Sequence, residues 1–148
     1  TFIIRSDASG FAVAGTLSQL QEGIIDADEK GTGELPIAFC SAKLNATQQN
    51  WATIEREAYA VIFCLKRWHS IIFSSPIILF SDHDPLTYIV KSSSTSAKLC
   101  RWSLAIQEYN IQFRYAKKCN NVVADCLSRP ISGKPREALS SGGCRDDL

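Results

Sequence analysis

A chain of 148 residues is long enough for one compact domain with its own core. Apolar residues make up 45% of the sequence, which is ordinary for a globular protein and too high for a disordered one. No apolar run reaches the length of a membrane span, so we expect none. With a net charge of only +1, a nucleic-acid-binding function would require the basic residues to gather on one face.

The chain starts at Thr1 and contains no methionine, so we expect it to be a segment of a longer protein. Its first residues do not resemble a signal peptide. The six cysteines lack the spacing of zinc ligands, and no secretory cue favours a disulfide framework. We therefore expect free thiols in a reducing compartment.

The first third of the chain predicts three strands. Residues 2–8, 11–19 and 36–42 alternate or are rich in strand-forming residues, and the polar stretch 21–34 is typical of a loop. Consecutive strands with short connections favour an antiparallel meander.

A capping-box pair, Asn45 and Gln48, precedes a helical pattern. Apolar residues then recur at intervals of three and four, which predicts one long amphipathic helix. These residues are Trp51, Ile54, Ala58, Val61, Leu65, Trp68 and Ile72.

The second half predicts two more strands among helices. The expected elements are a buried strand at 77–80, a short helix at 85–90, a helix carrying Leu99, Trp102 and Ile106, a strand at 110–115, and a final helix capped by Asn120 or Asn121 and running through Ser128. The order predicts an α/β fold, a five-stranded mixed sheet flanked by helices. We assign residues 1–130 to this domain and expect 131–148 to be a linker or disordered tail.

Two acids end predicted strands, Asp7 the first and Asp82 the fourth. If the crossover helix brings these strands side by side, both carboxylates lie at one end of the sheet. On the long helix, Glu57 lies roughly 60° from the centre of the apolar face and Glu55 roughly 100° on its other side. Glu57 thus borders the buried face, although pairing with Arg56 or Lys66 at the edge would be an alternative role.

Asp125 lies within an apolar turn of the last helix, where a solvated helix face is the alternative reading. Converging carboxylates repel one another unless divalent cations neutralise them, and clustered oxygen ligands suit Mg²⁺ or Mn²⁺. His83 could orient its neighbour Asp82 or simply form part of a turn.

Four segments together resemble a known family. They are Ser6-Asp7-Ala8-Ser9 with Leu17-Ser18-Gln19; Pro36-Ile37-Ala38-Phe39 with Lys43-Leu44 and Glu55-Arg56-Glu57-Ala58; Ser81-Asp82-His83 with Pro85-Leu86; and Arg101-Trp102, Gln107-Glu108-Tyr109 and residues 121–129. In order and spacing, residues 1–130 resemble the RNase H domain that follows reverse transcriptase in Gypsy-type LTR retrotransposons. Ser6 and Ala14 depart mildly from the family pattern, and Lys118 stands where a glycine is usual.

The resemblance implies an RNase H-like fold and an endonuclease that hydrolyses the RNA strand of RNA–DNA hybrids. Asp7, Glu57, Asp82 and Asp125 match the family's four metal-binding acids, which hold two Mg²⁺ ions, replaceable by Mn²⁺, roughly 3.5–4 Å apart. It also implies a parent polyprotein with an upstream reverse transcriptase domain, an RNA-directed DNA polymerase and hence a nucleotidyltransferase, in an intracellular, cytoplasmic retroelement particle.

Lys98, Arg101, Lys117 and Lys118 are candidates for phosphate contacts, with a solvated charged surface as the alternative. Two other functions remain open at this point. One is a catalytically idle connector or nucleic-acid-binding module with the same fold. The other is a DNA nuclease or transposase, against which the position of Glu57 on the first helix argues.

Overall fold

The computed structural model describes residues 1–117 and 127. Its elements, in chain order, are β1 (Phe2–Ala8), β2 (Ala12–Leu20), β3 (Glu34–Lys43), α1 (Ala46–Gln49), α2 (Thr53–Arg67), α3 (His69–Ile72), β4 (Pro76–Ser81), α4 (Pro85–Ser92), α5 (Ala97–Gln107) and β5 (Asn110–Tyr115). All five predicted strands are confirmed, β3 starting two residues earlier than expected. The predicted final helix and the tail lie outside the described residues.

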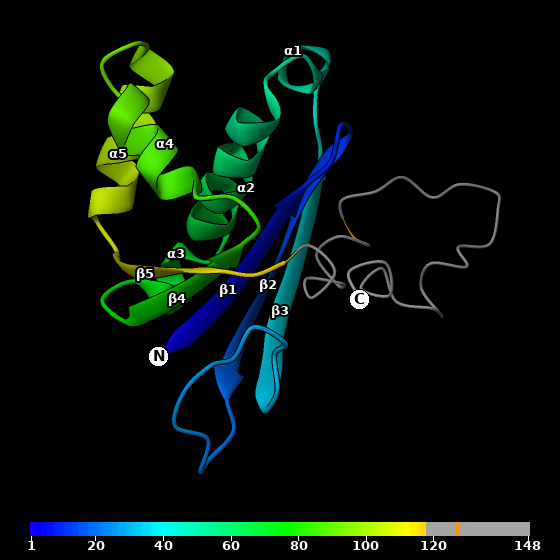
Figure 1. Ribbon diagram of the computed structural model, residues 1–148, viewed down its shortest axis with the longest axis vertical. Helices are drawn as coiled ribbons and strands as arrows, with labels where there is room; N and C mark the ends of the chain where they lie inside the picture. The colour runs from blue at the N-terminus through cyan, green and yellow to red at the C-terminus, as the bar shows by residue number, and fades with distance from the viewer. Residues whose placement is uncertain (118–126, 128–148) are drawn as a thin grey trace, which may run out of the picture.

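The strands form one mixed sheet in the order β3-β2-β1-β4-β5. The meander β1-β2-β3 is antiparallel, whereas β4 runs parallel to β1 and β5 parallel to β4. In Figure 1 the helices α2, α4 and α5 lie together on one side of this sheet. The chain crosses over through α2, which brings β4 beside β1 as the sequence predicts.

The main core lies between the sheet and α2. Ile4 and Leu79 of the sheet are buried against Val61 and Leu65 of the helix. Gly15 of β2 allows this close approach, because a Cβ atom there would overlap the Sγ atom of Cys64. Among the described cysteines, Cys40, Cys64 and Cys100 are free thiols, as expected.

The other face of the sheet is partly covered by the β2–β3 loop. Ala27 of this loop packs on a cluster that includes Ile3 and Phe80. Arg5 of β1 fastens the loop, since its guanidinium donates to the Glu34 carboxylate at 2.6 Å and to the Asp28 backbone oxygen at 2.7 Å. The loop is therefore part of the packed domain.

The predicted long amphipathic helix is confirmed as α2, but its extension to Trp51 and Ile72 is wrong. The helical region is broken into α1, α2 and α3, because Ala52 is extended (φ −59°, ψ 152°) and Trp68 also leaves helical geometry (φ −110°, ψ 17°). The Trp51 ring packs edge-on against Tyr59 of α2 and Trp102 of α5, with centroids 5.6 and 5.8 Å away. Packing between distant segments thus overrides the local apolar period.

The capping box at Asn45 is present, but it caps the four-residue α1 rather than a long helix. The short helix after Asp84 is confirmed and runs through Ser92, with the Asp84 side chain as its N-cap. None of the helices that the structure describes is long and apolar enough to span a membrane.

Candidate metal centre

Strand pairing places Asp7 and Asp82 at the same end of the sheet. The parallel register of β1 and β4 pairs Arg5 with Phe80, so two residues further on Asp7 and Asp82 follow at equivalent positions. Asp7 is still within β1 and is buried, whereas Asp82 directly follows the end of β4 and is partly exposed. The sequence-based expectation that these strand ends coincide is therefore confirmed.

Helix α2 carries two glutamates, Glu55 and Glu57, and directs one of them toward this end of the sheet. Glu57 is only 1% exposed, which is exceptional for a carboxylate. Glu55, two residues earlier, lies on another face of the helix, where it forms an ion pair with Lys98 of α5. The helical-face argument thus separates the two glutamates correctly, and Glu57 is buried more deeply than an edge position would require.

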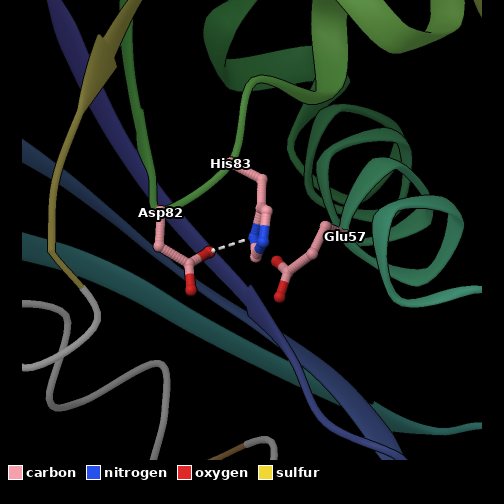
Figure 2. A group of neighbouring side chains, drawn as sticks. All are labelled: Glu57, Asp82 and His83. Carbon is pink, nitrogen blue, oxygen red and sulfur yellow. Dashed lines mark hydrogen bonds and ion pairs between the residues drawn. The ribbon is translucent and has the colours of Figure 1, made fainter.

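Glu57 and Asp82 form a compact group with His83 (Figure 2). The ligand atoms of the three side chains lie within 4.8 Å of one another. The Nδ1 atom of His83 is 3.1 Å from the Asp82 Oδ1 atom. The His83 side chain is 45% exposed and that of Asp82 15%, so the group is closed on the α2 side and open at the turn after β4.

The donor set fits a divalent cation. Two carboxylates in close proximity repel each other, and a bound cation offsets this repulsion. Carboxylate oxygens suit Mg²⁺ and Mn²⁺, and an imidazole nitrogen is accepted by transition metals. Among residues 1–117 and 127, these three side chains form the group of acids, histidines and cysteines whose ligand atoms are close enough together to hold an ion.

His83 is the member of this group to which sequence analysis gave no ligand role. The available signal was its position directly after Asp82, which indicated an orienting or turn residue. Only the packing of α2 against the β4 end brings the ring beside Glu57, a residue 26 positions earlier in the sequence.

The fourth predicted acid, Asp125, lies outside the described residues, but Leu127 nearby in sequence is described. Cross-strand pairing lines up Asp7, Ala14 and Ser41 in one row across β1, β2 and β3. Directly paired residues share a face of the sheet. The Ser41 hydroxyl, at the far end of the row, donates to the Leu127 backbone oxygen at 2.7 Å.

Of the basic residues expected to contact phosphate, Lys98 has its ammonium group engaged within the protein. Besides the Glu55 ion pair, its Nζ atom lies 3.7 Å from the centre of the Trp51 ring. Arg101 and Lys117 are exposed, and Lys118 lies outside the described residues. Near Lys98, burial and the Glu55 carboxylate raise the pKa of Tyr88 above its ordinary value of 10.

Residues 1–109 match the family of the RNase H-like domain found in reverse transcriptase. The chain is 39% identical over 129 residues to the retrovirus-related Pol polyprotein from transposon opus of Drosophila melanogaster, covering 86% of this chain and 12% of that protein. It is 36% identical over 129 residues to the Pol polyprotein from transposon gypsy of the same species, covering 86% of this chain and 11% of that protein. The chain spans about a tenth of the length of these relatives.

Among solved structures, the fold resembles the foamy viral protease-reverse transcriptase in complex with RNA/DNA hybrid, with a TM-score of 0.60 and 17% identity over 92% of this chain and 18% of that one. For the same viral protein in complex with dsDNA, the TM-score is 0.56 and the identity is 16%, over 79% of this chain and 23% of that one. At these identities the likeness concerns the fold, and it agrees with the five-stranded mixed sheet flanked by helices.

Proposed function

Since the chain belongs to the family of RNase H-like domains found in reverse transcriptase, with Pol polyproteins of gypsy-type transposons among its relatives, we propose that it is a divalent-cation-dependent endoribonuclease. Its substrate is the RNA strand of RNA–DNA hybrids. The observation that carries this proposal is the burial of Glu57 within 4.8 Å of Asp82, at the sheet end that also holds Asp7.

Asp7, Glu57, Asp82 and Asp125 are the proposed ligands. Bound Mg²⁺ or Mn²⁺ ions would supply an activated water and stabilise the leaving 3′ oxygen. Glu57 is held by α2 and Asp82 by the end of β4, so their carboxylates are fixed before substrate arrives. Asp125 lies outside the described residues, and its place in this set rests on its match to the family's motif.

The hybrid substrate has separate support. The foamy viral protease-reverse transcriptase, which resembles this chain in fold, forms a complex with RNA/DNA hybrid, and the family occurs in reverse transcriptase. Discrimination of RNA from DNA would come from contacts with the 2′-hydroxyl. We further propose that the domain works beside an upstream reverse transcriptase domain of a Pol polyprotein, in an intracellular retroelement particle.

The test is cleavage of an end-labelled RNA–DNA hybrid by the purified chain over a range of Mg²⁺ and Mn²⁺ concentrations. Glu57→Gln and Asp82→Asn should each lose about 100-fold or more of the activity, because several kcal/mol of metal-dependent stabilisation disappear. Glu55→Gln is the matched control, since it removes a carboxylate from the same helix outside the cluster. It should retain activity close to that of the unmodified chain.

Other outcomes favour the alternative functions. If the chain binds the hybrid without cleaving it, and calorimetry detects no binding of divalent cations, the chain is an idle connector or binding module. Equal cleavage of duplex DNA would identify a DNA nuclease. If the unmodified chain binds the cation but does not cleave the hybrid, and Asp82→Asn loses cation binding, then the metal centre is intact and the lack of cleavage is due to weak substrate binding.

A further inference from the structure

His83 is held in place from both sides. It occupies the short connection between β4, which ends at Ser81, and α4, which begins at Pro85. The following residue, Asp84, accepts a hydrogen bond from the Thr87 backbone N–H at 3.1 Å and so caps α4. The backbone at His83 is therefore anchored on both sides, which directs the side chain toward the end of β4.

The imidazole ring lies between the two carboxyl groups in Figure 2, with Asp82 on one side and Glu57 on the other. Its Nδ1 atom is within hydrogen-bond distance of Asp82 Oδ1. One potential ligand atom from each of the three residues lies within 4.8 Å of the other two. The ring is also 45% exposed on its outer side, so an ion can reach the group from solvent.

We propose that His83 is a nitrogen ligand of the divalent-cation site and that it makes this site favour Mn²⁺ over Mg²⁺. The inference rests on the proposed cation site and specifies its metal preference. Mg²⁺ accepts almost exclusively oxygen ligands and sheds its waters reluctantly, whereas Mn²⁺ takes carboxylate and imidazole ligands together. A site built only of carboxylates would discriminate less between the two ions.

The second histidine of the chain provides the matched control. The Nδ1 atom of His69 is 2.6 Å from the Tyr109 hydroxyl, and its ring also packs against Phe73. His69 lies at the start of α3, beyond the C-terminal end of α2, whereas Glu57 is near the start of α2. His69→Ala therefore removes an imidazole without touching the acid cluster.

The experiment measures Mn²⁺ and Mg²⁺ binding to the full chain at one fixed pH by calorimetry, without substrate. In His83→Ala the ratio of the Mg²⁺ to the Mn²⁺ dissociation constant should fall by about tenfold, the usual scale for losing a group that tunes a metal site. His69→Ala should leave the ratio unchanged. Thermal unfolding of both variants checks that each is folded before titration.

Pulsed electron paramagnetic resonance of bound Mn²⁺ tests ligation directly. The chain labelled with ¹⁵N-histidine should show a nitrogen hyperfine coupling that is lost in His83→Ala and kept in His69→Ala. An unchanged metal ratio would overturn the inference. So would a changed ratio without nitrogen coupling, because His83 would then act only by positioning Asp82.

The failure of the proposed function has a different signature. If the unmodified chain binds neither cation, or if Asp82→Asn binds Mn²⁺ as tightly as the unmodified chain, the cation site itself is refuted. Binding that depends on Asp82 but not on His83 leaves the proposed nuclease in place and removes only the nitrogen ligand.

Discussion

Arg5 and Glu57 are both buried charged side chains beside the same sheet, but their surroundings differ. Arg5 forms an ion pair with Glu34 at 2.6 Å, with both side chains less than 10% exposed, and its guanidinium also lies 4.2 Å from the centre of the Phe80 ring. Glu57 instead lies close to a second acid, Asp82, and to His83.

This contrast indicates two uses of buried charge. The Arg5 cluster contains its own counter-charge, and its hydrogen bonds fasten the β2–β3 loop to the sheet. The acidic cluster brings like charges together, an arrangement that burial makes costly and that a cation relieves. The first cluster should therefore stabilise the fold under all ionic conditions, whereas the second should stabilise it only when divalent cations are bound.

The largest expected effect is on the Arg5 cluster. Arg5→Ala should lower the free energy of unfolding by about 3–5 kcal/mol, because it leaves the Glu34 carboxylate buried without its cation. Urea unfolding followed by circular dichroism measures the loss. Arg114→Ala is the control, since the Arg114–Asp26 pair is more exposed and should contribute less than about 1 kcal/mol. Equal losses in the two variants would contradict the distinction between the clusters.

A smaller effect of opposite sign is expected at the acidic cluster. In EDTA, Glu57→Gln should unfold at the same or a higher temperature than the unmodified chain, with a gain of at most about 1–2 kcal/mol, because one of the like charges is gone. Adding Mg²⁺ at ten times its dissociation constant should stabilise the unmodified chain by about 1.4 kcal/mol and leave Glu57→Gln unaffected. Scanning calorimetry with and without Mg²⁺ decides the point, and a clear loss of stability in EDTA would show that Glu57 serves mainly the fold.

The smallest effect concerns Asp28, in the loop that Arg5 fastens. Hydrogen bonds from the Thr32 backbone and hydroxyl hold the pKa of Asp28 below its ordinary value of 3.8. A carboxyl whose folded pKa is depressed contributes stability above its unfolded pKa and loses it as the pH falls through the folded value. The protection factor of the Thr32 amide against hydrogen exchange should therefore fall below about pH 4, and Asp28→Asn should abolish this acid dependence. An identical pH profile in the variant would assign the change to other carboxyls.

Much of this architecture could be predicted from local pattern. Alternation of apolar residues located the strands, and the helical period separated Glu57 from Glu55 correctly. The break of the helical region could not be predicted in this way, because Trp51 fits the apolar period but packs against Trp102, a residue 51 positions later. Short-range periodicity carries no information about such a partner.

The candidate site, too, was predictable from local pattern in part and depended on tertiary packing for the rest. Residue type and position placed Asp7 and Asp82 at strand ends and Glu57 at the border of the buried helix face, because these properties depend on backbone geometry that repeats every two or 3.6 residues. The proximity of His83 to Glu57 was decided by the packing of α2 on the sheet. The sequence by itself determined which chemical groups the protein carries and which faces they occupy. The tertiary structure alone decided which of them share a space small enough for one ion, because that depends on contacts between segments far apart in the chain.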